Sequence, residues 1–156
     1  MFDPVDQSCE VQIGFTINQI KVGDTAVFGK TLTEADVYQF SGIIGNFNPL
    51  HVNKEFCVKT GRGERIVPSM LIASMVSKIL GTQLPGNGTV HVSQEMEFIR
   101  PVCIGDTLTC RVEVTCVDGK AKRVWFDVLC INQNGEVVAR GETEAIPPAC
   151  IDGGKR

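Results

Sequence analysis

The chain has 156 residues, of which 43% are hydrophobic and 21% are charged, proportions that are ordinary for a globular protein. Its formal net charge of −3 at pH 7 offers no basic stripe for nucleic acid and no polybasic patch for an anionic membrane. No apolar run approaches the roughly 20 residues that span a bilayer, and residues 1–6 lack the basic start and apolar core of a signal peptide. We therefore expect a cytoplasmic protein with a single domain over residues 13–148, a flexible segment at 1–12 and a tail at 149–156.

The N-terminal half predicts one strand followed by helices. Residues 26–32 have the composition of a strand. Thr33 stands three residues before Asp36, a spacing that caps a helix start, and we expect the helix to cover residues 34–44. A shorter helix is expected within residues 53–61, between a capping asparagine and a terminating glycine.

The segment Gly-Asn-Phe-Asn-Pro-Leu-His at residues 45–51 is the strongest indication of a functional site. It gathers two side-chain amides, one imidazole and a turn-forming Asn-Pro step just after the first helix. Pro49 fixes its own φ, so His51 is presented at a defined angle. Since histidine exchanges protons near neutral pH, His51 is the first candidate for chemistry, against the alternative of a hydrogen-bonded structural histidine.

A polar loop at residues 61–65 leads into the most hydrophobic stretch of the chain, residues 70–80. Lys78 is the only charge in this stretch, so we expect a helix that is buried on nearly every side and ends at Gly81. A helix of this kind belongs at the centre of the domain.

The C-terminal half alternates between apolar and polar residues with a period of two. The expected strands cover residues 90–98, 108–116, 124–131 and 137–146. The alternation places His91 on the polar, exposed face of the first of these strands. The pattern as a whole predicts an α+β domain in which a curved antiparallel sheet of about five strands wraps around the apolar helix. Such a sheet leaves edges that dimerisation would cover.

The seven cysteines contain no Cys-x-x-Cys pair, and only two histidines could serve as co-ligands. The odd number and this spacing argue against a zinc site or a disulfide framework and favour thiols in a reducing compartment. Cys110 and Cys116 fall on the apolar face of their strand, where cysteine acts as a small hydrophobe.

With its elements in this order, the chain resembles the MaoC-like dehydratases of the hot-dog fold, especially the (R)-specific enoyl-CoA hydratases. The resemblance covers residues 25–147. It is carried by residues 33–44, 45–51 and 66–81, by Gln83-Leu84-Pro85-Gly86 and by Phe98-x-x-Pro101-Val102-x-x-Gly105-Asp106. It implies a homodimer that binds an acyl thioester of coenzyme A or acyl carrier protein and reversibly adds water to a trans-2-enoyl group. Coenzyme A enters only as part of the substrate, and no metal is expected.

The resemblance assigns catalytic roles to the segment at residues 45–51. His51, Asn48 and Pro49 match the family pattern Asp-x-Asn-Pro-x-His, but Asn46 stands where the family has Asp. In the family, the carboxylate and the imidazole hold the water that attacks C3 while a proton reaches C2. The amide of Asn46 can hydrogen-bond this water but cannot take its proton.

The resemblance also extends to the buried helix and the loop before it. Pro68-Ser69 stands where the family usually has His-Gly, so the backbone N–H of Ser69 is expected to polarise the thioester carbonyl. Ser77 matches a serine that supports the family's site. Arg62 and Arg65 are candidate contacts for the coenzyme A phosphates, with a solvated loop as the equal alternative.

Asn46 leaves three functions open. The leading hypothesis is a hydratase or 3-hydroxyacyl thioester dehydratase whose activity is weakened by the altered pair. The second is a non-catalytic acyl-CoA binding or sensing protein, and the third is a hot-dog thioesterase, which would also miss the carboxylate. Asn46 is either a natural divergence, which the nearby Pro68-Ser69 change favours, or an engineered Asp-to-Asn change.

Overall fold

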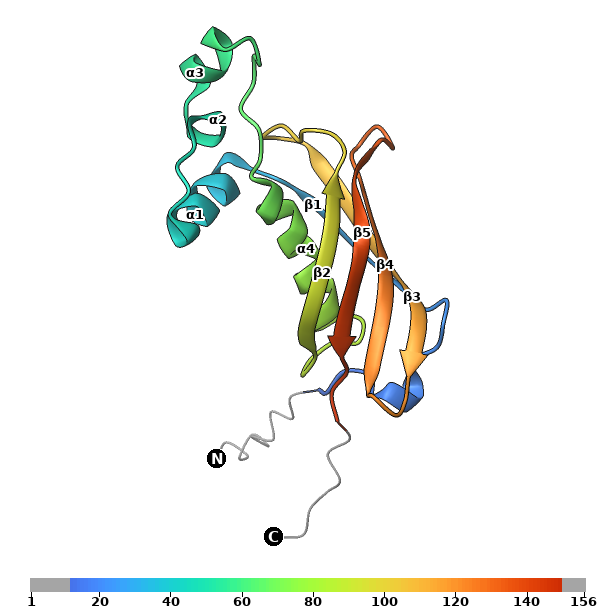
Figure 1. The fold of residues 1–156 in the computed structure, drawn as a ribbon. Helices are drawn as coiled ribbons and strands as arrows, with labels where there is room; N and C mark the ends of the chain where they lie inside the picture. The colour runs from blue at the N-terminus through green and yellow to red at the C-terminus, as the bar shows by residue number, and fades with distance from the viewer. Residues whose placement is uncertain (1–11, 150–156) are drawn as a thin grey trace, which may run out of the picture.

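The computed structural model describes residues 12–149, so the predicted flexible segment and tail lie almost wholly outside the described residues. Figure 1 shows one curved antiparallel sheet with a long helix, α4 (Ser69–Thr82), packed along one face. The five strands are β1 (Thr25–Thr31), β2 (Val90–Phe98), β3 (Thr107–Asp118), β4 (Arg123–Ile131) and β5 (Val137–Ile146). Their order is β1-β3-β4-β5-β2, so β1 and β2 are the edges of the sheet. The predicted α+β architecture, with a curved antiparallel sheet of about five strands, is confirmed.

The remaining helices form a lobe that extends beyond the β2 edge of the sheet (Figure 1). They are α1 (Glu34–Ile44), α2 (Pro49–Val52) and α3 (Lys54–Lys59), and a short 3-10 helix, η1 (Ile17–Gln19), precedes β1. The capping box at Thr33 and Asp36 is formed: the Asp36 N–H donates to Thr33 Oγ1 at 3.2 Å, and Asp36 Oδ2 accepts from the Thr33 N–H at 2.9 Å. Helix α1 ends at Gly45, whose φ of 70° is easily adopted by glycine. The predicted helix over residues 34–44 is therefore confirmed, whereas α2 was not predicted.

Helix α4 supplies the centre of the hydrophobic core, but only with one side. Its residues Val76, Ile79 and Leu80 are buried with side chains of the sheet such as Phe126, and each such burial stabilises the fold by about 1.5–3 kcal/mol. The other side contains Met70, which is 61% exposed, and two exposed serines. The prediction of burial on nearly every side is thus wrong for the single chain, because β2 is an edge strand and nothing in residues 12–149 covers this side. The helix also runs one residue past Gly81, where it was expected to end.

A β-bulge overturns the prediction that His91 is a surface residue. The register of β2 against β5 shifts between His91 and Ser93, so the side chains before the shift alternate out of step with those after it. His91 lies opposite the buried Ala145 and is half-buried. Its Nε2 lies 2.8 Å from Thr143 Oγ1, and the Thr143 hydroxyl donates to the Ser93 carbonyl, also at 2.8 Å. The imidazole must therefore donate from Nε2, so neutral His91 is the Nε2–H tautomer.

A second bulge and a disulfide correct the prediction for the cysteines. The register of β3 against β4 shifts between Val114 and Cys116, so Cys116 is exposed rather than on the apolar face. Cys110 is buried as predicted, but it is bonded to Cys130 on the neighbouring strand, and the expectation of thiols only is wrong for this pair. Burial raises the pKa of the Cys103 thiol, which lowers its thiolate fraction at neutral pH.

The stability of the fold is expected to depend on His91 at mildly acidic pH. Burial lowers the pKa of His91 below its ordinary value of 6.5, so below that pH the unfolded chain binds a proton more readily than the folded chain. The free energy of unfolding should therefore fall as the pH drops below 6.5. Thermal unfolding between pH 8 and pH 5, run beside His91→Gln, measures this. The variant, which keeps a donor but does not titrate, should show the shallower decline, and equal declines would contradict the prediction.

No helix in the part of the chain that the structure describes is both long enough and apolar enough to cross a lipid bilayer. No three His, Cys, Asp or Glu side chains within residues 12–149 gather closely enough to hold a metal ion.

Candidate active site

His51 is buried by a single helical turn that the surrounding sequence stabilises. Asn48 caps α2, its Oδ1 accepting from the Leu50 N–H at 3.1 Å. Pro49 occupies the first helical position, where its missing N–H costs nothing. The turn brings the imidazole into the protein, so that only 8% of His51 is exposed. Asn48 and Pro49 thus have a clear local function in placing His51.

A backbone carbonyl fixes the protonation of the His51 ring. Nδ1 lies 2.8 Å from the carbonyl oxygen of Ile66. Because a carbonyl oxygen can only accept, Nδ1 must carry the proton, and in the neutral ring Nε2 then has the free lone pair. His51 is therefore arranged as a base at Nε2. This contact with Ile66 has no signature in the sequence, because any residue supplies a carbonyl.

Asn46 lies directly after the glycine that ends α1, and its side chain is exposed. Its N–H donates to the Ser41 carbonyl at 3.1 Å, and its Oδ1 accepts from the Asn48 N–H at 3.1 Å. The second bond orients the amide: the oxygen is held by the backbone, so the NH₂ group occupies the other end. A water molecule at that end would be met by a donor and not by a base.

The segment before α4 joins His51 to the start of that helix. The Ile66 N–H donates to the Leu50 carbonyl at 3.0 Å, and the Val67 N–H donates to the Val102 carbonyl at 2.7 Å. Three residues beyond Ile66, Ser69 begins α4 with an exposed side chain. The backbone N–H of Ser69 has no acceptor among residues 12–149. It is therefore a donor at the positive end of a 14-residue helix, as the predicted role requires.

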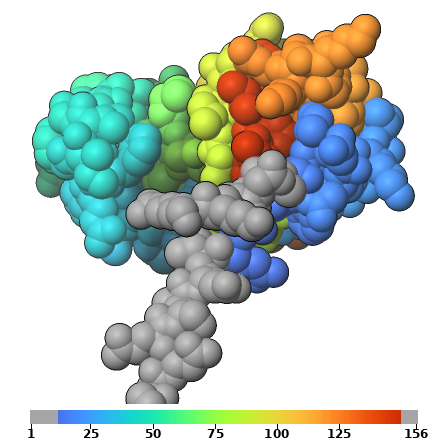
Figure 2. All heavy atoms as spheres, turned by 90° about the horizontal axis from the view of Figure 1, so that it is seen from below, coloured from blue at the N-terminus to red at the C-terminus, as the bar shows by residue number. Residues whose placement is uncertain are grey.

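An apolar groove of about 590 Å³ lies between α1, α4 and β2. Its lining is Phe40, Ile44, Met70, Ala73, Ser74, Ser77, Gln94, Met96 and Phe98. In Figure 2 the lobe, α4 and β2 follow one another across the molecule in this order. Ser77, predicted to support the site, lies in this lining, whereas His51, Asn46 and Ser69 do not. The lining includes Met70, the residue directly after Ser69, and Ile44, which lies two residues before Asn46.

Gln94 is a lining residue that sequence reasoning missed. Its side chain is half-buried, and its Nε2 donates to the Ala73 carbonyl at 3.2 Å. A polar residue in the apolar register of a strand was the available signal, because Gln94 alternates with Met96 and Phe98. The amide is the longest polar side chain in an otherwise mostly apolar groove.

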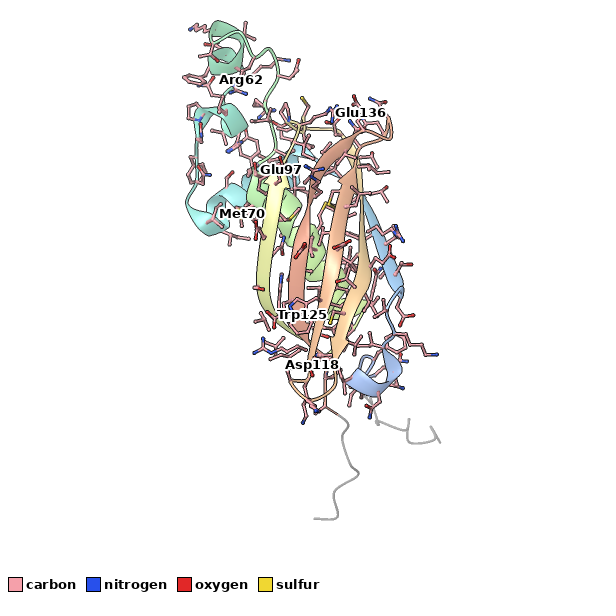
Figure 3. All side chains as sticks on the ribbon, turned by 45° about the vertical axis from the view of Figure 1, so that its right-hand side comes forward. Arg62, Met70, Glu97, Asp118, Trp125 and Glu136 are labelled. Carbon is pink, nitrogen blue, oxygen red and sulfur yellow. A yellow bond between two sulfur atoms is a disulfide. The ribbon has the colours of Figure 1, made fainter. Side chains whose placement is uncertain are left out.

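The two arginines of the preceding loop have different surroundings. Arg62 is exposed and lies toward the tip of the lobe, whereas Met70 lies at the base of the lobe (Figure 3). The Arg65 side chain is only 16% exposed and is paired with Glu34 on α1. Arg62 is thus open to a ligand phosphate and stays a candidate contact, while the donors of Arg65 are directed at the protein.

The chain is similar to known proteins in both sequence and fold. The family described as MaoC like domain matches residues 18–134. An (R)-specific enoyl-CoA hydratase of Rhodospirillum rubrum is 42% identical over 130 residues, which cover 83% of this chain and 90% of that protein. A 3-hydroxybutyryl-CoA dehydratase of Methylorubrum extorquens is 36% identical, with 88% of this chain and 92% of that protein covered. The solved structure of an unliganded (R)-hydratase from Pseudomonas aeruginosa has a TM-score of 0.83 and 32% identity, and the match covers 88% of each chain.

Proposed function

The chain belongs to the MaoC-like domain family, and on that premise we propose that it is a lyase that catalyses the reversible (R)-specific hydration of trans-2-enoyl-CoA to 3-hydroxyacyl-CoA. The observation that carries the proposal is the buried imidazole of His51, whose Nδ1 is engaged by the Ile66 carbonyl and whose Nε2 is left as a base. The relatives that support the substrate class are named as a hydratase and a dehydratase of CoA thioesters.

The reaction requires a base for water and a donor for the thioester carbonyl. His51 Nε2 takes a proton from water as the water oxygen bonds to C3, and the electrons of the C2–C3 double bond shift toward the carbonyl oxygen. The Ser69 N–H stabilises the negative charge that develops on that oxygen. The imidazolium then returns the proton to C2, so that one water has been added and the ring is neutral again. Asn46 holds the water with its amide but does not share in the proton transfer.

Incubation with crotonyl-CoA tests the proposal. We expect the absorbance of the enoyl thioester to fall, and chiral analysis should find (R)-3-hydroxybutyryl-CoA as the product. The reverse reaction, dehydration of (R)-3-hydroxybutyryl-CoA, should approach the same equilibrium. A folded protein that leaves both compounds unchanged would refute a hydratase.

A second candidate function is non-catalytic binding of acyl-CoA, which the amide at position 46 specifically favours. Saturable binding of acyl-CoA without turnover, even at high protein concentration, would support it. A thioesterase is distinguished in the same assay, because only hydrolysis releases free coenzyme A thiol. The neutral Asn46 weakens the case for a thioesterase as much as the case for a hydratase, because both would lack the carboxylate.

The proposal includes a homodimer formed along the β2 edge. The outer side of β2 is unpaired within the described chain. Large apolar side chains are exposed on α4 and on the lobe, among them Met70, Phe47 and the 83% exposed Ile43. A second copy packed here would cover these side chains and close the groove over the acyl chain. Sedimentation equilibrium tests this directly, and a species that stays at 17.0 kDa would contradict it.

Three parts of the expectation stay predictions. They are the cytoplasmic location, the absence of a cofactor beyond the coenzyme A of the substrate, and the choice between coenzyme A and acyl carrier protein. Parallel assays with crotonyl-CoA and a crotonyl acyl carrier protein decide the last of these.

A further inference from the structure

The guanidinium of Arg65 is held by two side chains of α1. Its Nη2 is paired with Glu34 Oε1 at 2.5 Å, and its Nη1 donates to the Tyr38 hydroxyl at 3.0 Å. The guanidinium carbon lies 5.8 Å from the centre of the Tyr38 ring, within the range of a cation–π contact. The hydrogen bond with Glu34 raises the pKa of Arg65, so the side chain is always charged. Because the Arg65 side chain is only 16% exposed, solvent screens this ion pair less than it screens an ordinary pair on the surface.

Two paths lead from Arg65 to His51. Along the backbone, the next residue is Ile66, whose carbonyl accepts from His51 Nδ1 and whose N–H donates to the Leu50 carbonyl. Through the side chains, the Tyr38 hydroxyl that Arg65 contacts reaches the Val52 carbonyl in a longer contact of 3.5 Å. Leu50 and Val52 are the two neighbours of His51, so the turn that carries the imidazole is held on both sides.

We propose that Arg65 is a positioning residue for His51, and that it acts through Ile66 and Tyr38 rather than by binding a phosphate of coenzyme A. The proposal rests on the proposed function only for its kinetic readout. Without the guanidinium, the segment that carries the Ile66 carbonyl loses its link to Tyr38, the α1 side chain that contacts the Val52 carbonyl. Displacement of a catalytic group by about 1 Å can cost about 10²-fold in rate. Loss of Arg65 should therefore lower kcat and leave the affinity for the thioester nearly unchanged.

The kinetic experiment compares Arg65→Met with the wild type on two substrates, crotonyl-CoA and crotonyl-pantetheine, which lacks the nucleotide phosphates. We expect kcat to fall about tenfold or more with both thioesters, with little change in KM. Glu34→Gln should give a smaller loss of the same kind, and the double variant should lose less than the sum of the two. Arg65→Lys, which keeps the charge, should recover part of kcat. A rise in KM confined to the coenzyme A substrate would overturn the proposal and make Arg65 a phosphate contact.

Lys54→Met is the matched control, because it removes an ion pair from the same lobe. Lys54 Nζ lies 3.6 Å from Glu64 Oε1, and both side chains are about two-thirds exposed, at 66% and 67%. Such an exposed pair contributes little, so kcat and KM should stay at their wild-type values. A loss of kcat equal to that of Arg65→Met would show a general effect of lobe stability and would overturn the specific role of Arg65.

A second readout does not depend on activity. The structure gives the two neutral histidines opposite tautomers, with the proton on Nδ1 in His51 and on Nε2 in His91. Nitrogen-15 NMR of the imidazoles distinguishes them, and Arg65→Met should convert part of the His51 signal to the Nε2–H form while His91 is unchanged. An unchanged His51 signal would overturn the proposal. If neither the wild type nor any variant hydrates an enoyl thioester, the proposed function fails. The tautomer measurement still shows whether Arg65 positions the His51 ring.

Discussion

Replacement of Asn46 by Asp is expected to raise kcat for the hydration of crotonyl-CoA by about 10²–10⁴-fold, the usual contribution of a well-placed general base. In the structure, Asn46 Oδ1 accepts from the Asn48 N–H at 3.1 Å. An aspartate can keep that bond with one oxygen, and the bond becomes stronger because the acceptor is charged. The second oxygen then stands where the NH₂ group was, so a donor is replaced by a group that can take a proton. The side chain needs no new conformation for this gain.

The measurement is the kcat of both proteins over a range of crotonyl-CoA concentrations, with the equilibrium constant of the reaction as an internal check. Asn48→Asp is the matched control, because it adds the same charge two residues away. Its oxygen caps α2, and aspartate caps a helix as well as asparagine does. An equal gain in Asn48→Asp would show that charge alone is responsible. If Asn46→Asp binds the thioester but turns over no faster than the wild type, the position does not serve as a base.

The local signals in the sequence were sufficient for the elements that place the site. The capping box at Thr33 and the glycine at position 45 mark both ends of α1, and the structure has them there. The Asn-Pro step predicted a fixed direction for His51, and the structure realises it as the short helix α2. In each case the decisive interaction lies within a few residues, where sequence patterns are most informative.

The features that could not be predicted depend on contacts between distant segments. A bulge inserts one residue into a strand without a change in composition, and it moves His91 from the polar face to a half-buried position. The Ile66 carbonyl determines the tautomer of His51 from 15 residues away, and a carbonyl leaves no trace in the sequence. The pairing of Arg65 with Glu34 joins residues 31 apart, so the arginine looked like a free cation of the loop.

The exposed side of α4 could not be predicted for the same reason, because it depends on contacts with distant parts of the structure. The apolar run at residues 70–80 correctly indicated a helix that avoids water, but in the single chain Met70 is 61% exposed. The sequence pattern indicates that an apolar surface must be buried, but it does not indicate whether the same chain or a second chain buries it. The exposed Met70 lines the groove between α4 and β2, and the unpaired edge of β2 lies beside the overhanging lobe, so together they support the proposed contact with a second copy.

Replacement of His51 by Asn is expected to lower kcat/KM for crotonyl-CoA by about 10²–10⁴-fold with little loss of stability. The amide nitrogen of asparagine can take the place of Nδ1 and donate to the Ile66 carbonyl, which accepts from the ring at 2.8 Å. No atom of asparagine replaces Nε2, so the base is removed while the hydrogen bond to Ile66 is kept. His51→Ala removes both and leaves the partly buried carbonyl without its partner, at a cost of about 1 kcal/mol or more.

The two His51 variants together separate chemistry from structure. Both should lose activity to a similar extent, but only His51→Ala should show a clearly lower midpoint of thermal unfolding, which calorimetry measures. The loss should be larger in the Asn46→Asp background than in the wild type, because two groups that hold one water act as a unit. If His51→Asn kept wild-type activity, Nε2 would not be the base, and the water would have to be activated by a group outside the segment at residues 45–51. If its activity and stability fell together as in His51→Ala, the imidazole would be needed for the fold rather than for proton transfer.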